Sequence, residues 1–221
     1  MKKNLLLWPL LTLGAVLAPS LYLLRVWPRL PAQIPTRFGL DGHATASTSR
    51  DHAWLLALAL PLGAALLLTA LPHLDPKRRL DGGSANFQKL RLLLVALLSG
   101  LAGYALYVSV HPNQPAGRGV ALLLGLFFAF LGNYLATVQP NYFVGIRTPW
   151  TLESPTVWAR THRVGGAFFF GAGLLLTVLA LVIPLAWLAA LERVVVLGGV
   201  AFCYGYSYLL FRREETAEHG A

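Results

Sequence analysis

Six long apolar stretches, each free of charged side chains, alternate along the chain with shorter segments rich in charged residues, proline and glycine. Because the hydrocarbon core of a bilayer is about 30 Å thick, a helix needs about 20 apolar residues to cross it. The pattern therefore predicts an all-α, polytopic membrane protein with six transmembrane helices. The predicted spans cover residues 5–24, 53–72, 91–110, 119–138, 164–184 and 190–211.

The first stretch follows Lys2 and Lys3 and therefore resembles a secretory signal peptide. Its apolar residues continue past Ala18 as far as Leu24, and Pro19 would directly follow the best cleavage position. We expect this stretch to be retained as the first span.

Composition and charge support the membrane interpretation. Hydrophobic residues make up 56% of the 221 residues, charged residues only 12%, and there is a single cysteine. These values exclude a disordered chain and a disulfide-stapled secreted domain. Although the net charge is +9, the basic residues lie mostly between apolar stretches, where they act as topology signals. We expect contact with the lipid bilayer and no direct contact with nucleic acid.

The distribution of Lys and Arg also predicts the orientation. With the N-terminus inside, 12 of these residues fall on inner segments and 6 on outer segments. Since positively charged loops are retained in the cytoplasm, we expect a multi-pass plasma-membrane protein with both termini cytoplasmic. The basic inner loop at 73–89 is interpreted as a solvated connector. The alternative is a contact for anionic lipid through Lys77, Arg78 and Arg79.

The first outer segment, residues 25–52, is rich in proline and glycine. Prolines block helix formation and glycines allow tight turns, so we predict an ordered, extended cap with a short strand or hairpin at Gln33–Phe38. Trp27 and Trp54 would anchor its two ends at the outer interface. The cap is either a lid that closes the bundle or a recognition surface. The cap residues singled out are Pro31, Pro35, Phe38, Gly39 and Gly42.

The segment at 132–166, on the inner side, combines many polar, aromatic and glycine residues. Pro140 should end the fourth span, and Ser154 followed by Pro155 predicts a short interfacial helix that begins near 155. Arg147 lies in a rigid setting between Gly145 and Pro149. It is either an internal link between loop and bundle or a contact for a ligand, lipid or partner.

The residues of this segment closely resemble the core signature of the SdpI family. The motifs are Gly132-Asn133-Tyr134, Pro140-Asn141-Tyr142-Phe143, Gly145 to Leu152, and Trp158-x-x-Thr161-His162-Arg163-x-Gly165-Gly166. The proline-rich cap is similar to a loop domain that often precedes this signature. We therefore divide the chain at residue 72, with a helical pair and its cap at 1–72 and the SdpI-like four-helix region at 73–221.

These bacterial membrane proteins are named for immunity to a secreted sporulation-delay peptide toxin. The resemblance implies six spans, protection from a peptide toxin outside, and retention of a small transcriptional repressor at the inner face. It also implies a set of candidate contact residues: Asn133, Tyr134, Asn141, Tyr142, Gly145, Arg147, Thr148, Pro149, Trp150, Trp158, Thr161, His162 and Arg163. Ala136, Gln139 and Arg37 depart from the usual family residues.

No motif for hydrolytic, phosphoryl-transfer or metalloprotease chemistry is present, so we expect a protein that is not an enzyme and has no cofactor. Asp41, His43, Asp51 and His52 are the residue types that bind zinc, but their spacing does not support a metal site. Two other functions stay open: a transporter or channel for a small amphipathic molecule, and a membrane enzyme that uses Arg147 and His162 on lipid or cell-wall precursors.

Overall fold

The computed structural model describes residues 6–38, 44–75, 80–112, 114, 116–141 and 143–219. The cap residues Gly39 and Gly42 and the candidate contact residue Tyr142 lie outside these ranges, as do Asp41, His43 and the basic run at 77–79. The major helices are α1 (Leu7–Val26), α2 (Leu60–Ala70), α3 (Ala85–Val110), α4 (Ala116–Leu135), α6 (Pro155–Val182) and α7 (Leu185–His219). Six helical segments in the described ranges are long and apolar enough to cross a membrane, which confirms the all-α, six-span class.

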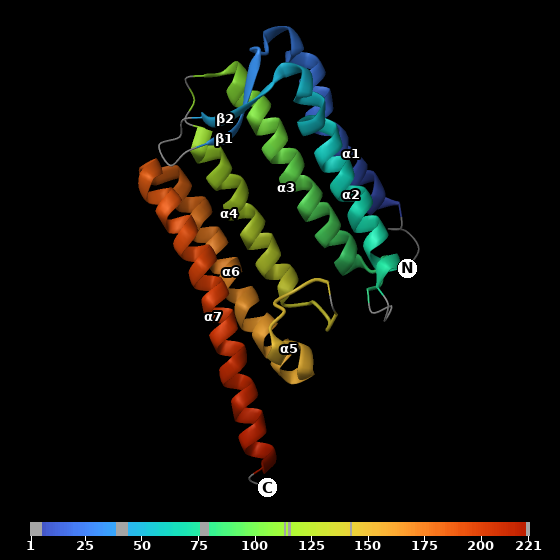
Figure 1. Cartoon of the computed structure of the whole chain (residues 1–221), viewed down its shortest axis with the longest axis vertical. Coiled ribbons are helices and arrows are strands. Elements are labelled where there is room, and N and C mark those ends of the chain that lie inside the picture. The colour runs from blue at the N-terminus through green and yellow to red at the C-terminus, as the bar shows by residue number, and fades with distance from the viewer. Residues whose placement is uncertain are drawn as a thin grey trace.

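Shorter elements connect or extend these helices. Strands β1 (Gln33–Phe38) and β2 (Ala44–Ser49) and the short helix α5 (Pro149–Glu153) lie between them. Single turns η1 (Trp27–Arg29), η2 (Arg50–His52) and η4 (Leu71–Leu74) and the π-helical turn η3 (Leu55–Ala59) lengthen the first two spans. The β-hairpin lies at one end of the bundle, and α5 and both termini lie toward the other (Figure 1). We call these the hairpin end and the α5 end.

The predicted cap strand is confirmed at Gln33–Phe38, where β1 pairs with β2 in an antiparallel hairpin. Ile34 of β1 is fully buried in an apolar cluster with Leu23 of α1 and Leu106 of α3. The rings of Trp27 and Trp54 lie 6.4 Å apart, so the two ends of the cap pack against each other. The hairpin is therefore seated on the ends of α1 and α3.

Helices α4 and α6 approach each other most closely, because glycines line their contact. A Cβ atom on Gly132 of α4 would lie 2.3 Å from the backbone nitrogen of Phe170 of α6. A Cβ atom on Gly173 of α6 would lie 2.3 Å from the nitrogen of Ala129. Since no side chain fits in these places, the two backbones are in direct contact, as in other small-residue helix interfaces.

The helix boundaries between α4 and α6 differ from the prediction. Helix α4 ends at Leu135, before Pro140, because the Tyr134 carbonyl accepts hydrogen bonds from the backbone N–H and the hydroxyl of Thr137. Ser154 does cap a helix that starts at Pro155, but that helix is not short: α6 continues without a break to Val182. The short helix is instead α5, which ends immediately before Ser154.

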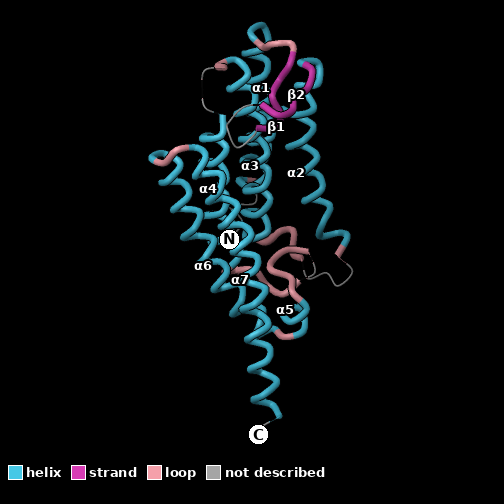
Figure 2. Tube along the Cα trace, turned by 60° about the vertical axis from the view of Figure 1, so that its left-hand side comes forward, coloured by secondary structure: helices cyan, strands magenta, loops and turns pink. Residues whose placement is uncertain are grey.

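Helix α7 is longer than the sixth predicted span. Its 35 residues correspond to about 50 Å at 1.5 Å per residue, whereas a bilayer core is about 30 Å thick. The C-terminal turns of α7 extend beyond the other helices at the α5 end (Figures 1 and 2).

Candidate functional site

The loop between α4 and α5 is folded around the buried side chain of Asn141. The amide nitrogen of Asn141 donates to the carbonyls of Gln139 and Val144 at 2.9 and 3.0 Å. Its carbonyl oxygen accepts from the backbone N–H groups of Phe143 and Val144 at 2.8 and 2.7 Å. Because all of these bonds are local, Asn141 fixes the shape of the loop and is not available for a ligand.

The next part of the loop is bound to the first turns of α6. His162 accepts a hydrogen bond from the Ile146 backbone N–H at Nε2 and has the Trp158 carbonyl 2.9 Å from Nδ1. An Nε2 that accepts must carry no proton, so these partners require the neutral ring with its proton on Nδ1. Trp158 stacks on His162 and donates from its indole nitrogen to the Val138 carbonyl.

Gly145 allows this close approach. Its φ of +126° lies where side chains are strained, and a Cβ atom there would be 2.4 Å from Nε2 of His162. The glycine, the histidine and the tryptophan are thus one packed unit, as their shared motif suggested.

Helix α5 joins this unit to α7. Thr148 and Thr151 form a reciprocal capping box at the start of α5, and the Thr148 hydroxyl donates to Ser207 of α7 at 2.9 Å. Trp150 packs against the rings of Tyr204 and Tyr208, with centroids 4.9 and 5.0 Å away. A second link forms farther along α7, where the Ser154 hydroxyl donates to the Glu214 carboxylate at 2.7 Å.

Other candidate contact residues point elsewhere. Arg147, Pro149, Arg163 and Asn133 are exposed, whereas Tyr134 is buried and Thr161 is fully buried with no partner for its hydroxyl in the described chain. Within that same part, no group hydrogen-bonds or ion-pairs with Arg147, which gives no support to the internal-link interpretation of this residue. The capping box and Asn141 hold the loop in its place, and the guanidinium of Arg147 is left free for solvent or a partner.

Asn133 and Tyr134 lie together in a mostly apolar cavity of about 480 Å³ at the α5 end. Trp8 of α1 and Lys89 of α3 line its other sides. Thr137 shares this cavity, in agreement with its position four residues after Asn133, but its hydroxyl bonds to the Tyr134 carbonyl rather than to a neighbouring helix.

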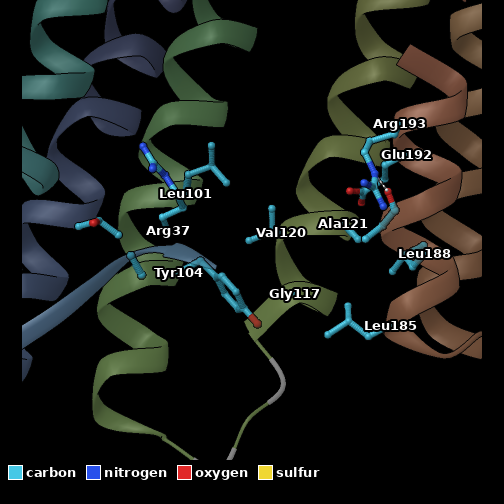
Figure 3. Close-up of a pocket in the computed structure, with 13 residues that line it drawn as sticks. Arg37, Leu101, Tyr104, Gly117, Val120, Ala121, Leu185, Leu188, Glu192 and Arg193 are labelled. Atoms are coloured by element: carbon cyan, nitrogen blue, oxygen red, sulfur yellow. Dashed lines mark hydrogen bonds between the residues drawn. The ribbon is translucent and has the colours of Figure 1, made fainter. Parts of the chain in front are cut away.

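A second cavity of about 430 Å³ lies near the hairpin end, between β1, α3, α4 and α7 (Figure 3). Its walls are mainly apolar and include Leu101, Val120 and Leu188. Polar side chains from three elements also line it: Thr36 and Arg37 of β1, Tyr104 of α3, and Glu192 and Arg193 of α7. The cavity thus combines an apolar interior with one acidic and two basic groups.

Glu192 and Arg193 are adjacent on α7, but the described residues contain no ion pair between them. The Arg193 Nε donates to the Ala189 carbonyl one turn earlier on α7, at 3.1 Å (Figure 3). The Oε1 atom of Glu192 is buried and has no hydrogen-bond partner among the described residues. The sequence alone could have identified Glu192 as a candidate site residue, because it is the only acidic residue between positions 164 and 211.

Within the described ranges, no three His, Cys, Asp or Glu side chains are grouped so that they could hold a metal ion. Asp41 and His43, two of the four residues considered for zinc, are outside those ranges. Cys203 is buried among apolar residues that include Leu135 and Phe169, as expected for a packing residue.

Comparisons with known proteins match two segments of the chain to family models. Residues 14–62, which include the cap, match a domain of unknown function, DUF1648. A segment of the chain is 33% identical over 96 residues to the immunity protein SdpI of Bacillus subtilis (strain 168), covering 43% of this chain and 44% of that protein. No solved structure matches the chain. Residues 137–207, which span the Asn141 loop, α5, α6 and α7 as far as Ser207, match the SdpI/YfhL protein family, so the resemblance is confirmed over this segment.

Proposed function

We propose that this membrane protein confers immunity to a membrane-active peptide, and that the peptide binds in the cavity at the hairpin end. The observation that supports this most directly is the composition of that cavity, in which apolar walls surround the free carboxylate oxygen of Glu192. The relative that bears the name of an immunity protein supports the same function. In the orientation predicted from Lys and Arg, this end faces outward.

The cavity matches the chemistry of an amphipathic, cationic peptide. An apolar side chain of the peptide would fill the space between Leu101, Val120 and Leu188. Its ammonium or guanidinium group would donate to Glu192, which has no partner for Oε1 within the described chain. Arg37, which is exposed on the hairpin, would hold a carboxylate of the same peptide.

The α5 end would deliver a response to binding. Arg147 and Arg163 are exposed there, and α7 extends beyond the bundle. We propose that this surface holds a small transcriptional repressor at the membrane. Thr148 and Ser207 connect this surface to α7, the helix that also carries Glu192, so one helix contacts both ends.

Protection of this kind requires no catalytic step. We propose that the protein sequesters the peptide and performs no chemistry on it. Recovery of intact peptide from protected cells, measured by mass spectrometry, would support sequestration, whereas a cleaved or modified peptide would favour an enzyme. Accumulation of the peptide inside the cell would favour a transporter.

The test is survival of bacteria that lack their own immunity protein and are challenged with a sporulation-delay peptide toxin. Wild-type protein should protect them, and Glu192→Gln should lower the protective effect by about tenfold, as expected when one charged hydrogen bond is lost. Glu153→Gln is the matched control, because Glu153 is exposed at the α5 end. If Glu192→Gln protected as well as the wild type, the cavity would be excluded as the peptide-binding site. If the wild type gave no protection, immunity to this peptide would be excluded.

A further inference from the structure

A third cavity, of about 750 Å³, lies at the α5 end where α2 stops and α3 begins. It is lined by Thr69, the turn η4, the glycine turn at 82–83 and the first two turns of α3. The third span begins at Ala85, so the cavity lies at the level where lipid headgroups meet the protein.

A buried arginine faces this cavity and forms no ion pair with a described residue. Arg91 of α3 is only 9% exposed, and its Nη1 donates to the Thr69 hydroxyl at 3.3 Å. Its Nε is buried and has no hydrogen-bond acceptor in the described part of the chain, where no ion pair to Arg91 is formed either. A buried guanidinium is costly unless an anion or a set of acceptors pairs with it.

One turn earlier on α3, Gln88 has a buried acceptor atom that lacks a hydrogen-bond donor among the described residues. Its Nε2 donates to the Gly82 carbonyl, and because that carbonyl can only accept, the orientation of the amide is fixed. The Oε1 atom of Gln88 is then buried and receives no hydrogen bond from a described residue. Residues three apart on a helix are neighbours. Within the described chain, a donor without an acceptor, Arg91 Nε, and an acceptor without a donor, Gln88 Oε1, are therefore side by side in one cavity.

We propose that this cavity binds a phosphate ester that also carries a hydrogen-bond donor, namely the headgroup of phosphatidylethanolamine or phosphatidylglycerol. The phosphate would accept from Arg91, and the ammonium or hydroxyl group would donate to Gln88. Asp81, whose carboxylate accepts from the Gly83 N–H at 2.9 Å, also lines the cavity. This acid disfavours a bare polyanion and suits a headgroup that contains a donor. His73 completes the polar lining.

The experiment measures lipid binding to the delipidated full-length protein by native mass spectrometry. Phosphatidylethanolamine and phosphatidylglycerol should bind about tenfold more tightly than phosphatidylcholine, whose headgroup contains a phosphate but no donor. Arg91→Gln should weaken binding of all three lipids by about tenfold, because each headgroup contains the phosphate. Arg160→Gln is the matched control, because Arg160 is exposed at the same end and does not line the cavity, and it should leave lipid binding unchanged.

A second variant keeps the proposal testable if Arg91→Gln does not fold. Gln88→Met retains Arg91 and removes the acceptor, so it should abolish discrimination against phosphatidylcholine while lipid binding persists. Competition by glycerol 3-phosphate at millimolar concentration would show that a soluble phosphate ester is the ligand. Unchanged lipid binding in Arg91→Gln together with an unchanged lipid preference in Gln88→Met would overturn the proposal.

Discussion

At the scale of single residues, the polar side chains of the loop mainly form hydrogen bonds within the loop or with the helices beside it. Asn141 closes the loop, His162 accepts the Ile146 N–H, and Thr148 caps α5. These groups need fixed partners because an unpaired buried polar group costs about 1–3 kcal/mol. Arg147, which is exposed, and Glu192 at the other end, whose Oε1 has no described partner, are therefore available to bind a ligand or partner.

Gly145→Ala should destabilise the protein, because the new methyl group would collide with His162 at a φ of +126°. We expect a loss of about 1–3 kcal/mol, the usual cost of a strained backbone position, measured as a lower melting temperature in detergent. Gly171→Ala is the control: that glycine lies in α6 with open space around it, so the exchange should be neutral or stabilising. Equal melting temperatures for both variants would contradict the packing of the loop on α6.

Arg147→Lys should leave the melting temperature near that of the wild type, since no described residue depends on the guanidinium. If the arginine contacts a repressor or lipid through a planar set of donors, the same variant should weaken that response in cells. The two readouts are melting temperature in detergent and cellular protection, measured side by side with His162→Ala, which should lower both. A lower melting temperature for Arg147→Lys would support the interpretation of Arg147 as an internal link.

At the scale of elements, the contact between α4 and α6 determines where the loop and α5 lie. Gly132 of α4 contacts the α6 backbone, and Gly166 of α6 lies against the carbonyl of Gly132. Without a hydrophobic driving force between helices inside a bilayer, such close packing is a main source of attraction. The position of Trp158 and His162 on α6 thus depends on glycines one turn or more away.

Gly132→Ala should separate α4 from α6, because the added methyl group meets the backbone of Phe170 rather than a movable side chain. We expect a loss of about 1–3 kcal/mol, typical of overpacking, again measured by thermal melting. Gly198→Ala in α7, where a Cβ atom would meet nothing within 4 Å, serves as the matched control. A wild-type melting temperature for Gly132→Ala would show that the two helices separate at little cost.

At the scale of the whole molecule, the two ends of the bundle differ in their surface chemistry. The hairpin end holds the cavity with Glu192 and Arg37, and the α5 end holds the exposed arginines, the cavity with Arg91 and the extension of α7. The proposed function requires that the hairpin end, which would bind the peptide, faces outward and that the α5 end, which would bind the repressor, faces the cytoplasm. The bias in Lys and Arg predicts that the α5 end does.

Single cysteines test this orientation. Ala46→Cys in β2 and Ala85→Cys at the start of α3, each combined with Cys203→Ala, lie at opposite ends; position 46 is half-buried and position 85 is exposed. An impermeant thiol reagent on intact cells should label position 46 and not position 85, and permeabilised cells should show both. The reverse labelling would invert the predicted topology and place the Glu192 cavity in the cytoplasm.

The sequence by itself determined the features that depend on local pattern. Six charge-free stretches specify six spans, the Pro-rich segment specifies the strand at Gln33–Phe38, and Ser154 with Pro155 specifies a helix start. Each of these follows from hydrophobicity or backbone chemistry within a few residues. The family signature likewise located the segment whose parts contact one another.

Only the tertiary structure decided which polar groups are paired. In the described chain, Glu192 Oε1 and the Arg147 guanidinium have no partner, and Arg193 bonds to the Ala189 carbonyl of its own helix. Gln88 and Arg91 became a candidate lipid site only because α2 ends beside them and encloses their side chains. The physical reason is that pairing depends on distances between helices, and these distances are fixed by contacts such as the one between Gly132 and Phe170, far from the charged residues in the sequence.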